Sequence, residues 1–406
     1  MSNVPVGYKQ TDVGVIPEDW EFFLLGNIAI FSQGTQVGLE KQIKVEKEGY
    51  IKFLRIENYT QQSGDFRFVP QDEGKNKIVH EDDIVVVRYG ATAGFIGIGL
   101  KGILANNLFK IEPNKKYLVK EFLFVFLKSD GVFKYFQDAM SGGAMPALSF
   151  KTVKKLSIIL PTLTEQTAIA TALSDVDALL NQLDKLIAKK RDIKQATMQQ
   201  LLTGKKRLAG FSGEWEVKKL GEVASLSRLN IIPANWPTQM YVHFSLPAFD
   251  EGKSPVVELG SEIKSNKFIV PEGTVLVSKL NPRIPRVWMP DEIPENSIAS
   301  TEFLVLFPKN GISRQFLFIL CKSPKFCEQM EKSATGTTGS HQRISPSDAL
   351  TMSIFVPSDS EEQTAIATLL TDMDNEISQL QQRRHKTHAL KQGMMQQLLT
   401  GKIRLI

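Results

Sequence analysis

Four short stretches have residue types that suggest catalytic chemistry, and each is incomplete. The segment FIGIG at 95–99 imitates a nucleotide-binding glycine turn, but it opens no convincing helix and has no acidic residue at the expected distance. Gly252-Lys253-Ser254 is similar to the end of a P-loop, with Pro247 where the first glycine is required. Asp250 with the triplet at 262–264 is a loose nuclease-like set, and Asn281-Pro282-Arg283 lacks the second proline and the aromatic residue of a base-flipping methyltransferase. We therefore expect binding, not catalysis, to carry the function.

Composition indicates a soluble cytoplasmic protein of two or three domains. The chain has 406 residues, 42% of them hydrophobic, which is enough for ordinary cores. No run approaches ~18 apolar residues, and the first residues lack the apolar segment of a signal peptide. Cys321 and Cys327 have neither CxxC spacing nor a nearby histidine ligand pattern. The cysteines therefore predict no disulfide framework and no metal site.

The chain repeats itself at an offset of 197 residues. Glu165–Leu208 aligns without a gap on Glu362–Leu405, with 25 of 44 positions identical. Similarity is fainter elsewhere, so each half has a constant element after a variable body. We expect domains at 1–161 and 210–357, each followed by a conserved helix, at 162–209 and 358–406.

The repeated element has the pattern of a long helix in a coiled coil. Capping-box spacing at Thr162/Glu165 and at Ser358/Glu361 predicts its start, and Gly204 and Gly401 predict a left-handed residue at its end. Apolar residues in between step by four and three, as in a coiled-coil seam. The predicted seam consists of Ile169, Leu173, Val176, Leu180, Leu183 and Ile187 in the first helix and Ile366, Leu370, Met373, Ile377 and Leu380 in the second. The connection between the halves favours antiparallel pairing, and 38 residues make a rod of roughly 57 Å.

The variable bodies predict a mixed α/β (α+β) fold. Apolar β-branched runs such as those at 84–87, 275–277 and 303–306 are separated by Gly, Pro and Asn turns, and aromatic-rich segments at 121–137 and 315–331 have helical length. The expected architecture is two small sheet-containing domains joined by two long helices that form an antiparallel coiled coil, as a pseudo-two-fold internal repeat.

Positive charge is concentrated at the ends of the repeated helices. Residues 185–207 carry eight Lys/Arg and one Asp, and residues 383–406 carry six Lys/Arg and no acid, although the whole chain has a net charge of only +5. Such runs are either solvated helix faces or contacts to phosphate or an acidic partner. Both interpretations stay open at this point.

The paired motif resembles the specificity subunit of type I restriction–modification enzymes. It consists of a proline, then Glu-Gln, Ile-Ala and Asp on one helix that ends in QQLLTGK, and it occurs after Pro161 and again after Pro357. The resemblance covers essentially the whole chain. It implies two target-recognition domains that each read half of a bipartite double-stranded DNA sequence, with the helices as spacer. It also implies two adenine-N6 methyltransferase subunits and motor-nuclease subunits as partners. S-adenosylmethionine, magnesium and ATP would then belong to these partners, and this chain would hold no cofactor or metal.

Base-reading candidates are polar residues in turns at strand ends, because Arg or Lys pairs with guanine and Asn or Gln with adenine. Met145-Pro146-Ala147 aligns with His341-Gln342-Arg343, so one place in the two halves has opposite chemistry. We rank the three residues at 341–343 highest, although a surface turn with arbitrary side chains would have the same pattern. The full candidate set is Arg88, Tyr89, Asn106, Asn107, Lys279, Asn281, Arg283, Arg286, His341, Gln342 and Arg343.

Two other classes of function stay open from the residues alone. The bodies could contain an unrecognised nuclease or methyltransferase site, or the helices could form a scaffold for two protein partners without nucleic acid. Turnover of DNA by the purified chain would favour an enzyme. Salt-sensitive DNA binding without turnover would favour a specificity subunit, and neither activity would favour a scaffold.

Overall fold

The computed structural model describes residues 4–11, 14–140, 146–309, 311–336 and 341–405. The chain divides into two compact units, which are residues 1–182 with 383–406 (unit 1) and residues 183–382 (unit 2). Each unit contains one variable body, the first part of the helix that follows this body, and the last part of the helix from the other half. The domain boundaries drawn from the sequence kept the helices separate, whereas the contacts divide both helices between the units.

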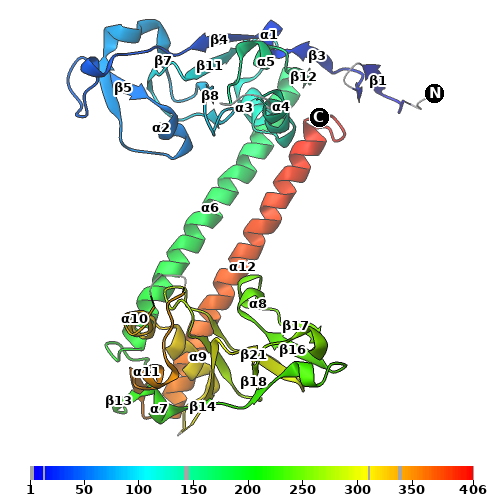
Figure 1. Ribbon diagram of the computed structural model, residues 1–406. Helices are drawn as coiled ribbons and strands as arrows, with labels where there is room; N and C mark the ends of the chain where they lie inside the picture. The colour runs from blue at the N-terminus through cyan, green and yellow to red at the C-terminus, as the bar shows by residue number, and fades with distance from the viewer. Residues whose placement is uncertain (1–3, 12–13, 141–145, 310, 337–340, 406) are drawn as a thin grey trace. The chain divides into compact units, whose positions relative to one another are not determined.

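Two small sheets form the body of unit 1 (Figure 1). The first is antiparallel with the order β4-β11-β8-β9, made of β4 Ala29–Gln33, β11 Leu108–Pro113, β8 Ile84–Val87 and β9 Ile96–Gly97. The second has the order β6-β5-β10-β7, made of β6 Arg67–Pro70, β5 Tyr50–Leu54, β10 Gly102–Leu104 and β7 Ile78–Val79, with β5 and β10 parallel. All four residues of β8 are buried, as expected for an apolar β-branched run inside a body.

Short helices and two two-stranded antiparallel sheets complete unit 1. The strand pairs are β1 Tyr8–Thr11 with β2 Gly14–Pro17, and β3 Glu21–Leu24 with β12 Ser157–Leu160. The helices are α1 Leu25–Ile28, η1 Leu39–Lys41, α2 Ile56–Thr60, η2 Gln71–Lys77, α3 Lys120–Leu127, α4 Asp130–Met140 and α5 Phe150–Lys154.

Unit 2 has the same plan although its body shares little sequence with that of unit 1. Its antiparallel sheet has the order β14-β22-β19-β20, made of β14 Ala224–Ser227, β22 Phe303–Pro308, β19 Val275–Ser278 and β20 Val287–Trp288. Its second sheet has the order β15-β18-β21-β16-β17, made of β15 Asn230–Ile231, β18 Lys267–Ile269, β21 Ser297–Ser300, β16 Met240–Phe244 and β17 Val256–Leu259, with β16 and β21 parallel. The pair β13 Trp215–Lys219 with β23 Ser353–Pro357 matches β3 with β12. The helices are α7 Leu220–Val223, η3 Pro233–Asn235, α8 Leu246–Asp250, η4 Gly260–Glu262, α9 Arg314–Lys322, α10 Pro324–Lys332 and α11 Pro346–Leu350.

The aromatic-rich segments expected to be helical are each two helices. In unit 2 the break falls at Ser323-Pro324, where the Ser323 hydroxyl accepts a hydrogen bond from the Phe326 N–H (3.2 Å) and Pro324 takes the first helical position. Both features start a new helix, because proline has no N–H to give to the preceding turn. In unit 1 the break falls between α3 and α4, with Ser129 next to the start of α4.

The repeated elements are α6 Leu163–Leu201 and α12 Ser360–Leu398 (Figure 1). Gly204 (φ 67°) and Gly401 (φ 71°) have left-handed backbone after the last turn, which confirms the predicted helix ends. In unit 1, Lys391 of α12 lies 2.7 Å from Asp177 of α6. In unit 2, Asp374 and Glu376 of α12 lie 2.5 and 2.6 Å from Lys194 and Lys190 of α6. In unit 1, Arg404 after α12 also contacts Glu165 near the start of α6 (2.8 Å). Rising numbers on one helix therefore meet falling numbers on the other, and the predicted antiparallel pairing is confirmed within each unit.

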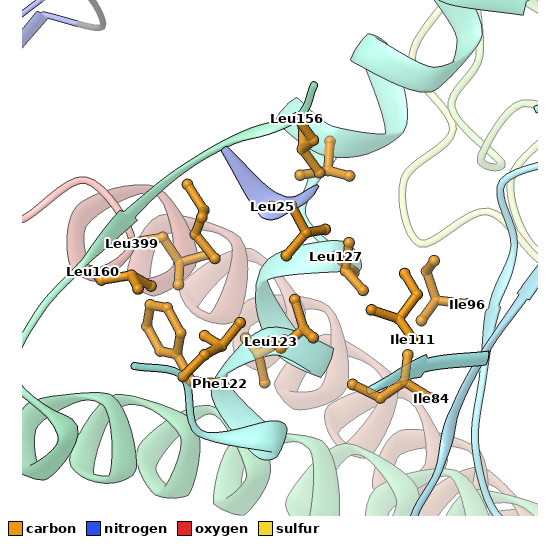
Figure 2. Packing of buried hydrophobic residues seen from close by; sticks show 14 of the residues in the cluster. Leu25, Ile84, Ile96, Ile111, Phe122, Leu123, Leu127, Leu156, Leu160 and Leu399 are labelled. Atoms are coloured by element: carbon orange, nitrogen blue, oxygen red, sulfur yellow. The ribbon is translucent and has the colours of Figure 1, made fainter. Parts of the chain in front are cut away.

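Each hydrophobic core includes side chains from the helix of the other half. In unit 1, Met395, Leu398 and Leu399 join the cluster that contains Trp20, Phe122 and Leu160. Figure 2 shows Leu399 close to Leu160 and Phe122. In unit 2, the matching residues Met198, Leu201 and Leu202 join the cluster of that body. No described helix is long and apolar enough to cross a membrane.

Candidate nucleic-acid interface

The ends of three strands bring the unit 1 candidates together at one edge of the first sheet. Strand β8 ends just before Arg88, β4 ends at Gln33, and β11 begins after Asn107, so antiparallel pairing places these points side by side. The Arg88 N–H donates to the Asn107 carbonyl oxygen (2.9 Å), and the Gln33 side-chain amide donates to the Asn106 carbonyl oxygen (2.9 Å). We call Gln33, Arg88, Tyr89, Asn106 and Asn107 the strand-end surface of unit 1.

Arg88 is held by aromatic rings, and no carboxylate of the described residues pairs with it. Its guanidinium carbon lies 4.8 Å from the ring centre of Tyr89 and 5.1 Å from that of Phe150, within the range of cation–π attraction. Arg88 Nε and Asn107 Oδ1 are both buried, and neither has a hydrogen-bond partner among the described residues. Buried polar atoms without partners are rare in proteins, so this edge has donor and acceptor capacity that the protein leaves unused.

The same backbone arrangement recurs in unit 2. The Lys279 N–H donates to the Glu302 carbonyl oxygen (2.9 Å), which makes Lys279 the counterpart of Arg88 and Glu302 the counterpart of Asn107. Leu280 forms a β-bridge with Arg343 in unit 2, and the equivalent bridge in unit 1 joins Tyr89 and Ala147. The Asn281 N–H donates to the Gln342 carbonyl oxygen (2.7 Å), as Gly90 donates to Pro146 (3.1 Å).

These contacts confirm the alignment of 146–147 with 342–343; Met145 lies outside the described residues. The strand-end surface of unit 2 consists of Arg228, Lys279, Asn281, Glu302, Gln342 and Arg343.

The side chains on this shared backbone differ between the units. Arg343 Nε lies 3.2 and 3.1 Å from the two carboxylate oxygens of Glu302, where unit 1 has Ala147 and Asn107. Asn281 has positive φ (48°), a conformation that asparagine tolerates in turns, and its buried Oδ1 also has no partner among the described residues. The two surfaces therefore share geometry and present different chemistry.

The remaining candidates are placed less uniformly. Arg283 is exposed in the turn after Asn281, and His341 is exposed next to Gln342. Arg286 differs from them, because Asp250 holds both Nε (2.8 Å) and Nη2 (2.9 Å) of its guanidinium and its side chain is only 13% exposed. This hydrogen bond and ion pair lower the pKa of Asp250. A base could reach Arg286 only by displacing a bidentate carboxylate, so we leave Arg286 out of the surface.

Three surface residues were not found from the sequence, namely Gln33, Arg228 and Glu302. Gln33 ends β4, and Arg228 directly follows β14, the matching strand. Glu302 stands in the turn between β21 and β22. The sequence showed them as polar residues at strand ends, but only strand pairing shows which strand ends share an edge.

The repeated Glu-Gln pair closes each unit against the helix tail of the other half. Glu165 accepts hydrogen bonds from the Arg404 guanidinium (2.8 Å) and from the Trp20 indole (3.1 Å). Glu362, which is fully buried, accepts two from Arg207 (2.7 and 2.5 Å). Burial would raise the pKa of Glu165, but the hydrogen bonds from Arg404, the Leu405 N–H and Trp20 outweigh it and lower this pKa.

The following glutamine ties α6 or α12 to its body. Gln166 accepts from the Val119 N–H (2.8 Å) and donates to the Tyr117 carbonyl oxygen (2.9 Å), and the Ser313 N–H donates to Gln363 (3.4 Å).

The predicted capping box is wrong in its glutamate half at the first helix and in its serine half at the second. Thr162 does accept from the Glu165 N–H (3.3 Å), but the Glu165 carboxylate is used by Arg404 and Trp20 instead of the helix start. At the second helix the Glu361 N–H donates to Asp359 Oδ1 (2.8 Å), while the Ser358 hydroxyl donates to the Glu214 carbonyl oxygen (3.0 Å). At the first helix a long-range ion pair replaces half of the box, and at the second helix Asp359 takes the place of Ser358.

The repeated aspartate meets lysines from two directions. Asp374 lies 2.5 Å from Lys194 of α6 and 2.9 Å from Lys322 of α9. Burial would raise the pKa of Asp374, but hydrogen bonds from both lysines outweigh it and lower this pKa; burial lowers the pKa of Lys194 despite the same contact. In unit 1, Asp177 meets Lys391 in the same way. Part of the positive charge at the helix ends is therefore neutralised within the protein.

The predicted seam residues differ in burial along the helices. Ile169 and Leu173 in unit 1 and Ile366 and Leu370 in unit 2 are buried in the cores of the bodies. Leu180, Leu183, Ile187 and Ile377 are buried outside these clusters, whereas Val176, Met373 and Leu380 are half-buried. The roles of these side chains in helix pairing stay a prediction.

Comparisons with known proteins cover both halves of the chain. The family model described as type I restriction modification DNA specificity domain matches residues 17–195 and 212–387. The MjaVIII type I restriction enzyme specificity subunit of Methanocaldococcus jannaschii is 27% identical over 422 residues, which cover 96% of this chain and 94% of that protein. The MjaIX specificity subunit of the same organism is 24% identical over 291 residues, 64% of this chain and 63% of that protein.

Solved structures show a similar fold. The S subunit of a type I restriction-modification system from M. genitalium matches 96% of this chain and 97% of its own, with a TM-score of 0.59 and 15% identity. A chain from a structure of type I restriction-modification complex assembly matches 96% and 99%, with a TM-score of 0.55 and 16% identity. Both likenesses concern the fold alone.

Proposed function

Because the chain belongs to the type I restriction–modification DNA specificity family, we propose that its two units each read one half of a bipartite, asymmetric DNA sequence. The chain is a specificity subunit and not an enzyme. Two adenine-N6 methyltransferase subunits would carry the chemistry, with S-adenosylmethionine as methyl donor. Motor-nuclease subunits would use ATP and magnesium. The helices α6 and α12 would hold the two units apart along the DNA, so that the bases between the half-sites are not read.

One observation carries this proposal, which is that the two strand-end surfaces share their backbone and differ in their side chains. A fixed backbone brings side chains to the same position relative to a groove, and base identity is read by the side chains. Unit 1 has Arg88 and Asn107 at the positions where unit 2 has Lys279 and Glu302. Two different readers on one scaffold are what an asymmetric target requires.

The unused hydrogen-bonding atoms support the same surface. Arg88 Nε, Asn107 Oδ1 and Asn281 Oδ1 are three of the six buried side-chain atoms without a partner among the described residues. All three lie on the strand-end surfaces. Base edges in the major groove supply both donors and acceptors, and a base could satisfy these buried atoms once their side chains turn outward.

The test is a map of methylated adenines in a host genome with and without this chain. Removing the chain should abolish methylation at one bipartite sequence. Asn106→Ala, at an exposed residue, should relax discrimination in one half of that sequence, and Lys279→Ala should relax the other half. Lys309→Ala is the matched control, because Lys309 is exposed at the opposite end of β22 from Glu302. An unchanged methylation map without the chain would contradict the proposal.

Purified chain separates the other two functions. Turnover of DNA by the chain alone would support a self-contained enzyme. An absence of both turnover and salt-sensitive DNA binding in the purified chain would support a protein scaffold.

A further inference from the structure

Unit 2 contains an arginine whose backbone is fixed on both sides at the strand-end surface. Arg343 pairs with Leu280 on one side and with Thr335 on the other. The Arg343 N–H donates to the Thr335 carbonyl oxygen (2.8 Å), and the Thr335 N–H donates back (2.9 Å). The position of the Arg343 side chain therefore does not depend on a free loop, and precise placement is what base recognition needs.

Glu302 also fixes the direction of this side chain. Both carboxylate oxygens of Glu302 contact Nε of Arg343, and Nη1 donates weakly to the His341 carbonyl oxygen (3.4 Å). Nη2 makes no hydrogen bond to a described residue. Arginine has five N–H donors in one plane, so the end of the guanidinium keeps donors for a ligand while its Nε side is occupied.

The charges of the pair argue for specificity and not for general affinity. A lone glutamate at a DNA interface would be repelled by phosphates, whereas the ion pair is neutral overall. Arg343 is 47% exposed and Glu302 25% exposed, so the pair itself contributes little to stability. Unit 1 has neither member, because Asn107 and Ala147 stand at the matching places. Both charges are thus present in one reader and absent from the other.

We infer that Arg343 reads the guanine of a G·C base pair in the half-site of unit 2, and that Glu302 is the positioning residue that orients its guanidinium. Guanine presents two acceptors in the major groove, O6 and N7, and a guanidinium can donate to both at once. This inference rests on the proposed function, and it adds the base class that one residue pair recognises.

The experiment uses the full chain in its methyltransferase complex. It measures how tightly this complex binds DNA duplexes that carry the mapped target. Each guanine position of the unit 2 half-site is replaced in turn by 7-deazaguanine, which lacks the N7 acceptor. With the wild-type chain, one position should lose affinity by about 2- to 12-fold, because 7-deazaguanine removes one of the two hydrogen bonds of a bidentate contact. In Arg343→Ala this penalty should disappear, while penalties in the other half-site stay unchanged.

Three further variants keep the inference falsifiable if Arg343→Ala folds poorly. Arg343→Lys retains the charge but replaces the planar guanidinium with a single ammonium group, so it should keep affinity for unmodified DNA at low salt concentration and reduce the penalty only in part. Glu302→Gln retains the shape and removes a negative charge, so it should reduce the penalty without weakening binding overall. Lys309→Ala removes a positive charge from the other end of β22 and should keep the full penalty.

Several outcomes would overturn the inference. A full penalty that persists in Arg343→Ala would show that another residue reads the guanine. Equal weakening on every duplex would indicate a phosphate contact. Insensitivity of every guanine in the half-site would exclude a guanine reader of this kind. In each case the proposed function still stands if the wild-type chain binds its mapped target selectively, and it fails only if that selectivity is missing.

Discussion

A fragment that ends at Ala209 should form a homodimer in which each copy completes the other. In unit 1 the tail of α12 supplies Met395, Leu398 and Leu399 to the core and Arg404 to Glu165. The fragment lacks this tail but contains an equivalent one. The residues at the matching positions of α6 are Met198, Leu201, Leu202 and Arg207, identical in type, and they make the same contacts in unit 2. The tail of a second copy can therefore fill the place that the missing residues leave.

The expected strength follows from the burial of these side chains. Each of the three apolar residues is at least nine-tenths buried in the whole chain. At ~1.5–3 kcal/mol for each side chain, two sets of three contribute ~9–18 kcal/mol to a symmetric dimer. The predicted seam residues Leu180, Leu183 and Ile187 would add a similar amount from the two copies. These contributions exceed the association cost of ~4–15 kcal/mol, so a stable dimer is expected.

Sedimentation velocity between about 0.5 and 50 μM checks this, with circular dichroism to establish that the fragment is folded. Leu201→Asp and Arg207→Glu should each shift the fragment to monomer, because they place a charge in the core cluster or against Glu165. Lys205→Ala is the control, since Lys205 is exposed beside the same tail. With the methyltransferase partner present, the dimer should prefer an inverted repeat of the first half-site. A folded fragment that stays monomeric at 50 μM, or a dimer that still prefers the asymmetric site, would refute the reasoning.

Three more perturbations test the helices. Arg207→Ala should destabilise unit 2 by ~3–5 kcal/mol in denaturant unfolding, because Glu362 is left buried without its partner. Lys332→Ala, at the exposed pair with Glu328, should change the unfolding free energy little. Equal effects of the two substitutions would contradict this prediction. Asp374→Asn should be destabilising at pH 7. The folded-state pKa of Asp374 lies below its ordinary value of 3.8, so its contribution is present above that pH and is lost as the pH falls through the folded pKa. The difference between Asp374→Asn and the wild type should therefore shrink below about pH 4, and a constant difference would count against the ion pairs. Removing one heptad from each helix, Leu180–Leu186 and Ile377–Arg383, shortens each by ~10 Å and should contract the preferred gap between half-sites by about three base pairs. Selection from a spacer-randomised DNA pool measures this gap, and an unchanged gap would argue against a spacer role.

Local features of the fold were predictable because their signals are local. A repeat of identical residues, a 4–3 apolar spacing and a glycine after the last turn are all read along one segment, and α6 and α12 begin and end close to the predicted residues. The alignment of 146–147 with 342–343 also came from the sequence, because equal spacing to the following strand survived in both halves.

The sequence by itself determined that the chain has two like halves, where their helices lie, and that turns after 84–87 and 275–278 carry polar side chains. Only the tertiary structure decided which distant residues meet. Glu165 could cap its own helix or bind Arg404, and the long-range ion pair wins because a nearly buried carboxylate gains more from a guanidinium than from one backbone N–H. Glu302 became a candidate only when the pairing of β19 with β22 and the bridge between Leu280 and Arg343 placed it beside Arg343, 41 residues further along the chain. Sequence spacing does not predict such contacts, because strand pairing brings together residues that lie far apart along the chain.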